Sequence, residues 1–202
     1  MNRLLYVLVV LMALLPIRAL NMQTQSFKRF KRQAISIVVS CGFLGAGCPS
    51  AFAAADMKTF TDSVHKVSVN YPSSWTENKA ELSGDRTVDA FVNPADASAS
   101  ISYVWTPIPA DFAKLTSFGD LDGYLIPKGE GVKTEVIKKE TKGDKMTLEY
   151  VTSAPDNPTR HVITVFALRS AEGVAGLTAQ SDESSFKSNE PLFKEAVQSL
   201  KM

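Results

Sequence analysis

The first 55 residues of this 202-residue sequence contain no acidic side chain, and no cysteine follows residue 48. The chain beyond residue 55 therefore cannot form a disulfide within itself. It has only two histidines, His65 and His161, which excludes a Cys/His nucleophile pair and a histidine-rich zinc site. Asn157 precedes a proline, which removes the one near-match to an N-glycosylation sequon. The fold must be stabilised by its hydrophobic core alone.

Motifs of the common nucleotide-binding and hydrolytic sites are also missing. The sequence has no G-x-x-x-x-G-K-[ST], no G-x-G-x-x-G and no G-x-S-x-G, so phosphate cradles, dinucleotide sites and nucleophile elbows have no support. Residues 120–123 (Asp-Leu-Asp-Gly) lack the third acid and the distant glutamate of an EF-hand loop. We interpret them as a turn with solvated acids.

The acid-free N-terminal stretch contains two export-type segments. Each has a basic start and a short apolar run, residues 4–15 in the first and residues 34–44 in the second. Both runs are shorter than the roughly 20 residues that a permanent membrane-spanning helix needs. The second segment ends in Ala51-Phe52-Ala53, an A-x-A cleavage signal.

We predict cleavage after Ala53, which makes residues 1–53 a targeting presequence. Residues 21–26, between the two runs, are polar and acid-free, the composition of a very short organelle transit segment. Two sequential signals imply that the protein crosses at least two membranes. Two alternatives stay open: a single secretory signal that starts at Met22, and an uncleaved N-terminal anchor.

Residues 54–202 have the size of one domain with an adequate core. They contain all 21 acidic residues but only 16 of the 22 basic residues, since six lie in the presequence, so their net charge is −5. Nucleic acid is therefore excluded as an expected partner, because phosphate binding needs a positive surface.

Most of this part has the alternating or β-branched pattern of strands, separated by Gly, Pro, Asn and Asp. The expected strands are residues 66–71, 87–92, 100–106, 132–140, 146–152, 160–169 and 174–181. Short turns at residues 142–144 and 171–173 predict two hairpins. The sheet should therefore be mainly antiparallel.

Apolar residues recur at helical spacing from Leu192 to Leu200, after a polar stretch that ends in Pro191. This pattern predicts an amphipathic helix that begins near residues 188–191. A second, short helix is expected at residues 121–125. Helices packed on an antiparallel sheet give an α+β domain.

Two groups of side chains are candidates for binding. Trp75 and Trp105 could serve as ligand platforms, but we expect both in the core, as is usual in a domain of this size. Four lysines, Lys138, Lys139, Lys142 and Lys145, surround a predicted hairpin. They are either a solvated face or a basic patch that docks an acidic partner.

The order of several local strings resembles the PsbP family, the extrinsic thylakoid-lumen proteins of photosystem II and their relatives. Residues 67–75 resemble the family's opening strand with its Pro-x-x-Trp, and residues 160–164 its strand with a basic residue, His and Ile-Thr. The other strings that carry the resemblance are residues 91–104, 117–121 and 177–182, Phe186 and the terminal Phe-x-x-Ala helix. The resemblance covers nearly all of the chain after the presequence.

The resemblance implies an α-β-α sandwich around an antiparallel sheet and a non-enzymatic role on the lumenal subunits of photosystem II, peripheral to the thylakoid membrane. Family members help to retain calcium and chloride at the manganese cluster, or they assist photosystem assembly and repair. Calcium would then be held indirectly, through photosystem II, and no cofactor would be bound covalently. Two export signals fit a thylakoid-lumen protein of a plastid, with the first signal suggesting a plastid of secondary origin.

In the family, a strand histidine pairs with an acid just beyond the end of the Ala-Gln strand. His161 matches the histidine, and either Asp182 or Glu183 matches the acid. An adjacent carboxylate favours the charged form of an imidazole in an acidic lumen. The pair is either a structural ion pair or part of a docking surface.

One departure from the family concerns the basic arm that precedes the first strand in ion-retaining members. Here only residues 54–65 precede the first expected strand, and Lys58 is their sole Lys or Arg. Three other function classes stay open at this point: a lumenal enzyme, a small-ligand carrier with an apolar pocket under Tyr103 and Trp105, and a nuclear GTPase-binding protein of similar fold.

Overall fold

The computed structural model describes residues 56–82, 86–108, 113–115, 125–155 and 157–202. These residues lie in one compact unit, Ala55–Met202. Both apolar runs of the presequence and the predicted cleavage residues Ala51 and Ala53 fall outside the described residues.

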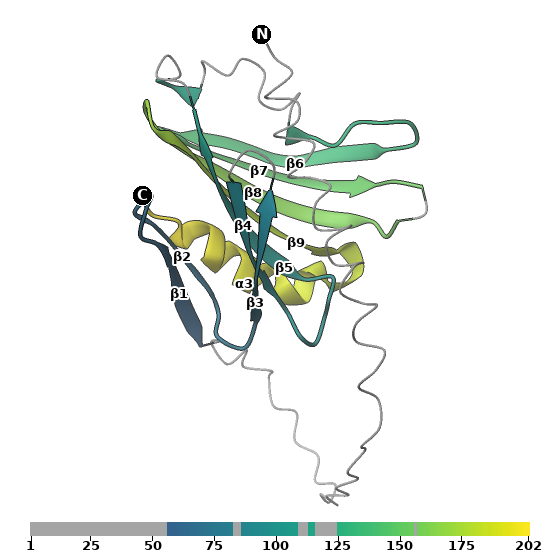
Figure 1. The fold of residues 1–202 in the computed structure, drawn as a ribbon. Helices are drawn as coiled ribbons and strands as arrows, with labels where there is room; N and C mark the ends of the chain where they lie inside the picture. The colour runs from purple at the N-terminus through teal and green to yellow at the C-terminus, as the bar shows by residue number, and fades with distance from the viewer. Residues whose placement is uncertain (1–55, 83–85, 109–112, 116–124, 156) are drawn as a thin grey trace, which may run out of the picture. The chain divides into compact units, whose positions relative to one another are not determined.

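A seven-stranded antiparallel sheet forms the main layer, with the strand order β3-β4-β5-β9-β8-β7-β6 (Figure 1). Its strands are β3 (Thr76–Leu82), β4 (Arg86–Val92), β5 (Ser100–Pro107), β6 (Lys133–Lys142), β7 (Lys145–Ser153), β8 (Arg160–Arg169) and β9 (Gly173–Asp182). A separate antiparallel hairpin joins β1 (Met57–Asp62) to β2 (Val67–Pro72). Helix α3 (Glu183–Ser199) follows β9 without a loop.

The α+β class and the antiparallel sheet are confirmed, and each of the seven expected strands is present within one or two residues of its expected bounds. Most of these strands were predictable because their buried faces alternate with less buried ones, or because both faces are buried, as in β8. Strand β6, whose residues are mostly exposed, was predicted together with the turn that joins it to β7. The short helix expected at residues 121–125 lies outside the described residues except for Leu125.

Two strands, β1 and β3, were not predicted. Strand β1 pairs only with β2, and three of its six residues are exposed and none is fully buried, so its sequence shows no clean apolar alternation. Strand β3 is an edge strand whose sequence, Thr-Glu-Asn-Lys-Ala-Glu-Leu, favours a helix by propensity. Pairing with β4 along its whole length overrides this preference.

The start of the terminal helix was predicted wrongly, because α3 begins at Glu183 and contains Pro191 in its interior. The buried stripe of the helix begins with Phe186 and Asn189, which lie about two turns and one turn before Leu192, the first apolar residue used for the prediction. A proline inside a helix leaves the carbonyl four residues earlier without its amide donor. Pro191 and Lys187 both lie on the exposed side of α3, where water can take that donor's place.

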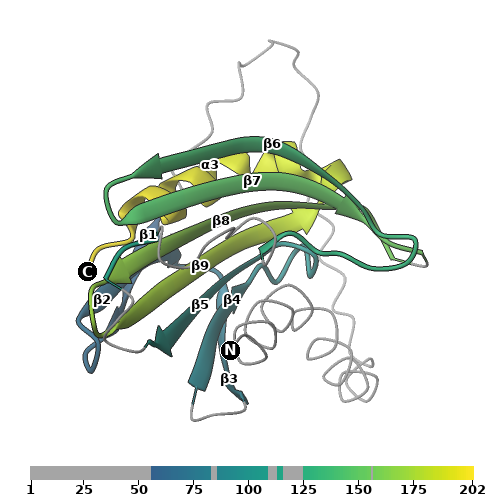
Figure 2. The same cartoon turned by 90° about the horizontal axis from the view of Figure 1, so that it is seen from above.

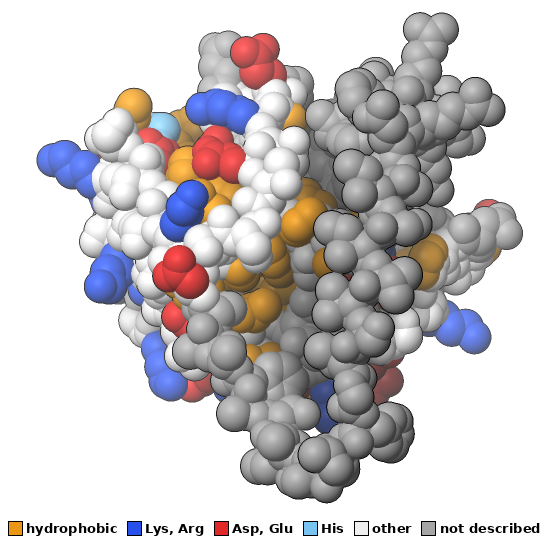
Figure 3. All heavy atoms as spheres, turned by 90° about the horizontal axis from the view of Figure 1, so that it is seen from below, with side chains coloured by type: hydrophobic (Ala, Val, Ile, Leu, Met, Phe, Trp, Pro, Cys, Tyr) orange, Lys and Arg blue, Asp and Glu red, His pale blue; other side chains and the backbone are white. Residues whose placement is uncertain are grey.

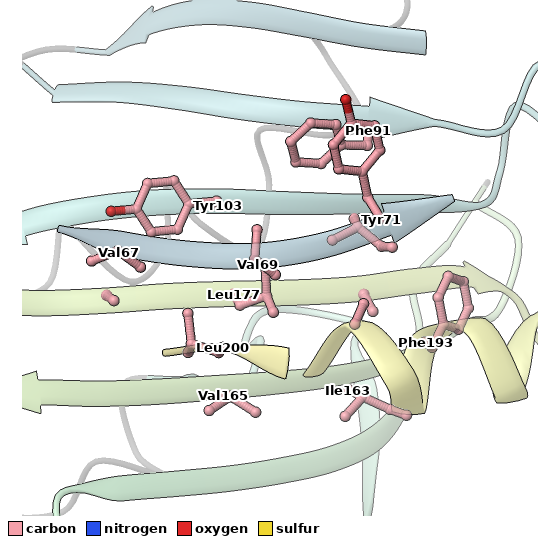
Figure 4. Close-up of a cluster of buried hydrophobic side chains, with 14 of the residues drawn as sticks. Val67, Val69, Tyr71, Phe91, Tyr103, Ile163, Val165, Leu177, Phe193 and Leu200 are labelled. Carbon is pink, nitrogen blue, oxygen red and sulfur yellow. The ribbon is translucent and has the colours of Figure 1, made fainter. Parts of the chain in front are cut away.

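Helix α3 and the β1–β2 hairpin cover the same face of the sheet (Figure 2). Figure 4 shows the contact, in which Phe193 of α3, Leu200 just after the end of α3 and Val69 of β2 lie over Ile163 and Leu177 of the sheet. All five side chains are at most 4% exposed. Burial of this size, worth about 1.5–3 kcal/mol per large apolar side chain, stabilises the fold.

The opposite face of the sheet is also apolar over β7 and β8. Leu148, Tyr150 and Phe166 on this face are buried, and so are Leu115 and Leu125 of the segment between β5 and β6. On the face shown in Figure 3, basic and acidic side chains are interspersed.

The two tryptophans lie in the core, as expected from the sequence. Trp75 and Trp105 are 7% and 8% exposed, and Trp75 makes an edge contact with Phe193. The indole of Trp105 lies against Gly173, where a Cβ atom would overlap the ring and come within 2.8 Å of the Thr106 carbonyl oxygen.

We therefore expect Gly173→Ala to destabilise the domain by about 1–3 kcal/mol, the usual cost of overpacking a core. Urea unfolding of residues 54–202, followed by tryptophan fluorescence, measures this change. Gly129→Ala is the matched control, since its nearest neighbouring atom would be 3.4 Å away. Equal stability of the two variants would contradict the tight packing of Trp105 on β9.

Candidate functional site

His161 is the second residue of β8 and lies on the sheet face that α3 covers. Because α3 starts directly after β9, its first turn lies beside the start of β8. The imidazole stacks in parallel on the ring of Phe186, with 3.4 Å between the ring centroids. Only 6% of His161 is exposed.

Two carboxylates contact the two nitrogens of this imidazole. Nδ1 of His161 lies 2.8 Å from Oε2 of Glu183, and Nε2 lies 2.9 Å from Oε1 of Glu149. A neutral imidazole carries a single N–H donor. Both contacts are hydrogen bonds only if the imidazole is doubly protonated or one carboxyl group carries the proton. The three side chains, here called the His161 cluster, connect β7, β8 and α3.

The structure distinguishes the two acids that the sequence proposed as partners of His161. Glu183 contacts the imidazole, whereas Asp182 pairs with Arg160, whose Nε lies 3.3 Å from Oδ1 of Asp182. That oxygen makes no hydrogen bond, so the contact with Arg160 is an ion pair without hydrogen-bond geometry. The backbone N–H of Asp182 donates to Ser98 Oγ at 3.2 Å.

Glu149 was missed from the sequence, although the hairpin register could have indicated it. In the β7–β8 ladder Val151 lies opposite His161. Side chains two residues apart on a strand share a face and reach the diagonal position of the neighbouring strand. Glu149 is thus the diagonal neighbour of His161 on the face covered by α3.

A second polar cluster lies at the far end of β8, roughly 26 Å along the strand from His161 at 3.3 Å per residue. Asp62 Oδ2 accepts a hydrogen bond from the Tyr103 hydroxyl at 2.8 Å and lies 2.7 Å from Nδ1 of His65. The His65 imidazole stacks on Trp105, whose ring also carries the Arg169 guanidinium, 5.5 Å from its centroid. These contacts hold the β1–β2 hairpin against the end of the sheet.

The charges of Asp62 and Asp89 respond to this environment in opposite directions. Partial burial acts to raise the pKa of Asp62, but the hydrogen bonds from the His65 backbone N–H, the His65 ring and Tyr103 outweigh it and hold this pKa below its usual value. Burial raises the pKa of Asp89, against the opposing effect of Lys79 at 3.8 Å. Burial and the bond to Asp62 also raise the pKa of Tyr103.

The four lysines of the predicted basic patch are not an uncompensated block of charge. Glu140 lies 3.1 Å from Lys138 and 2.6 Å from Lys142, and these hydrogen bonds lower the pKa of its carboxyl group. Lys145 donates to the Leu200 carbonyl oxygen at 2.6 Å, at the end of α3. Lys139 lies opposite Leu148 in the β6–β7 ladder. Docking of an acidic partner on these lysines stays a prediction.

Within the described part of the chain, no group of three or more His, Cys, Asp or Glu side chains is arranged to hold a metal ion. The described residues also contain no helix that is long and apolar enough to cross a membrane. Residues 120–123 lie outside the described ranges.

The sequence model of the PsbP family matches residues 55–202, which is the whole unit that carries both polar clusters. The chain belongs to the PsbP family. The match begins two residues after the predicted cleavage at Ala53; cleavage itself stays a prediction.

A curated relative of this PsbP-family chain is the chloroplastic PsbP domain-containing protein 3 of Arabidopsis thaliana, 22% identical over 148 residues. The alignment covers 66% of this chain and 60% of the relative, so the chain spans less than two thirds of the relative's length.

Among solved structures, the cyanobacterial PsbP of Synechocystis sp. PCC 6803 has the same fold, with a TM-score of 0.56 and 18% identity. That match covers 77% of this chain and 98% of the cyanobacterial one. The Ran-binding protein Mog1p of Saccharomyces cerevisiae matches with a TM-score of 0.47 and 14% identity over 73% of this chain and 96% of its own.

The two acids of the His161 cluster should contribute unequally to the stability of this PsbP-family domain. The side chain of Glu149 is 16% exposed and that of Glu183 is 49% exposed. We expect Glu149→Gln to lower the free energy of unfolding by about 1–2 kcal/mol, and Glu183→Gln to lower it by less, because solvent screens the more exposed pair. Urea unfolding measures both.

Glu135→Gln, at an exposed position of β6, is the control and should change stability by less than about 0.5 kcal/mol. An effect of Glu149→Gln no larger than that of this control would contradict the structural role of the cluster.

In the second polar cluster, the contribution of Asp62 to stability should depend on pH. A carboxyl group whose pKa is lowered by folding stabilises the fold above its unfolded-state pKa of about 4, and this contribution disappears as the pH falls through the folded-state value. We therefore expect Asp62→Asn to destabilise the domain by about 1–3 kcal/mol at neutral pH. The difference from the wild type should shrink below about pH 4.

Asp89→Asn should behave in the opposite way. Because folding raises the pKa of Asp89, its contribution to stability is present below the unfolded-state pKa and is lost as the pH rises through the folded-state pKa. At neutral pH we expect Asp89→Asn to leave stability unchanged or to increase it. Thermal unfolding of both variants across the pH range tests the pair, and parallel losses at neutral pH would contradict this assignment.

Proposed function

We propose that this PsbP-family protein is a non-enzymatic extrinsic protein of the thylakoid lumen that associates with photosystem II. The observation that carries the proposal is a family match over all of residues 55–202, preceded by an acid-free stretch with two export-type segments. The chloroplastic relative supports a plastid location. Peripheral attachment to the thylakoid membrane is part of the proposal.

The proposed role is support of the oxygen-evolving complex, by helping photosystem II to retain calcium and chloride. This role follows from the family resemblance. In it the protein contacts calcium only indirectly, through photosystem II, and carries no covalently bound cofactor. Its contribution would be to cover a lumenal surface of the complex.

A role in photosystem assembly or repair is the second candidate, and strand β1 favours it. Residues 54–65 were expected to precede the first strand, but residues 57–62 form β1 and pair with β2 along their whole length. If cleavage occurs after Ala53, only residues 54–56 remain ahead of the first strand. So short a segment leaves little chain to insert into a groove of the photosystem.

The docking surface is not assigned by this proposal. The lysines around the β6–β7 turn and the His161 cluster are the two candidates. Lys138, Lys142 and Lys145 lie on the same sheet face as the His161 cluster, next to α3, where Glu183 is half exposed and Lys142 is 81% exposed. Lys139 lies opposite Leu148 on the other face.

The test is to separate thylakoid complexes on a native gradient and to quantify the protein in each fraction by mass spectrometry. An oxygen-evolving-complex subunit should be present in nearly equal numbers with active photosystem II cores and should be released by a salt or alkaline wash. Its removal should lower oxygen evolution, and added calcium and chloride should restore it.

Trace amounts on immature complexes would instead support the assembly or repair role. Absence from the thylakoid fractions would contradict both candidates.

A further inference from the structure

Strand β6 is the last strand of the sheet and pairs only with β7 among the described strands. Its outer edge therefore presents backbone N–H and C=O groups to which another strand can add. Eight of its ten residues are exposed. This edge is the longer of the two edge strands of the seven-stranded sheet.

Two adjacent apolar side chains are exposed at the middle of this edge. Val136 is 44% exposed and Ile137 is 51% exposed, and they make up two of the four exposed large hydrophobic residues in the described part of the chain. The ladder with β7 shifts register between Val136 and Lys138, so Ile137 is the extra residue of a β-bulge.

The bulge brings the charged residues of β6 onto one face of the sheet. Before it, Lys133 and Glu135 lie opposite Ser153 and Val151 of β7; after it, Lys138 and Glu140 lie opposite Glu149 and Thr147. The four β7 residues are spaced by two and share one face. Along that face the charges of β6 alternate in sign, in the order Lys133, Glu135, Lys138, Glu140, Lys142.

An alternating order of this kind is complementary to itself when the strand runs antiparallel to a second copy. If Val136 lies opposite Ile137 of the second copy, then Glu135 lies opposite Lys138 and Lys133 lies opposite Glu140. The two-fold axis repeats each pair, which gives four cross-strand ion pairs around four apolar side chains. Opposite charges across a strand pair are favourable, and like charges are not.

Neighbouring registers lack this complementarity. A shift that places Lys133 opposite Lys142 also places Glu135 opposite Glu140, and a shift the other way places Lys133 opposite Lys138. The favourable register depends on the bulge. Before the bulge the charged face of β6 carries odd-numbered residues, and after it the same face carries even-numbered residues, so Glu135 and Lys138 can lie opposite each other on one face.

We propose that β6 pairs in antiparallel fashion with β6 of a second copy of this chain, in the register that places Glu135 opposite Lys138. Lysines and bulges can also protect an edge strand from pairing with another strand. Such protection does not require that positive and negative side chains of β6 lie opposite each other in an antiparallel pair of two copies. One strand pair buries less surface than a stable interface of roughly 1,200–2,000 Å². The dimer is therefore weak and depends on concentration, and it does not depend on the function proposed above.

The test is a charge swap in residues 54–202, a compact unit with its own core, followed by analytical ultracentrifugation over a range of concentrations. Glu135→Lys alone places ammonium groups opposite each other, and Lys138→Glu alone places carboxylates opposite each other. Each single variant should raise the dimer dissociation constant by about tenfold or more, and the double variant should return it close to the wild-type value.

Lys142→Glu is the matched control. Lys142 contacts Glu140 within its own strand, as Lys138 does, but in the proposed register it lies beyond the end of the paired β6 segment. This variant should therefore dimerise like the wild type, which separates loss of the contact with Glu140 from loss of the pairing. Circular dichroism checks that all variants fold.

Several results would overturn the proposal. The wild type remaining monomeric up to concentrations on the order of 1 mM would exclude pairing of two copies. Binding of isolated photosystem II cores by such a monomer, abolished by the β6 substitutions, would assign the edge to a partner protein instead. A dimer unaffected by either single substitution, or not restored by the double one, would place the contact on another surface or in another register.

Discussion

Burial of one face of the antiparallel sheet beneath α3 and the β1–β2 hairpin is the constraint on which the rest of the structure depends. With no cysteine after residue 48, packing alone holds these elements together, through Phe193 and Leu200 above Ile163 and Leu177. The same packing fixes the end of the chain. The backbone of Lys201 pairs with Ser68 of β2, and Lys145 of β7 binds the Leu200 carbonyl oxygen.

The two polar clusters lie where this apolar layer ends. At the start of β8, His161 connects two carboxylates and so joins the first turn of α3 to β7 and β8. At the other end of β8, Asp62 and Arg169 attach the β1–β2 turn to Tyr103 and Trp105. Each cluster connects a covering element to the sheet through charged groups. At the cluster of Asp62, whose pKa folding lowers, protonation of the carboxylate weakens the attachment of the β1–β2 hairpin.

The extent to which the sequence predicted this structure follows from burial. Strands such as β8 and β9 were predictable because their apolar patterns reflect burial. The residues of β1 and β3 are mostly exposed or only partly buried, and these segments are strands because they pair with β2 and β4. The start of α3 was misplaced because Pro191 resembled a boundary, although tertiary contacts of Phe186 extend the helix beyond it. At the site, Glu183 was one of two proposed partners of His161, but Glu149 comes from another strand, and only the ladder register identifies it. In β6, likewise, only the bulge shows that the charged side chains share one face of the sheet.

The proposed function requires that residues 54–202 lie inside the thylakoid lumen after both export segments are removed. The most direct measurement is to treat intact thylakoids with protease, before and after opening them with detergent, and to read the N-terminus of the protected protein by mass spectrometry. We expect a protein that starts at Ala54 and is degraded only after the membranes are opened. Degradation in intact thylakoids, or an N-terminus within residues 1–53, would contradict it.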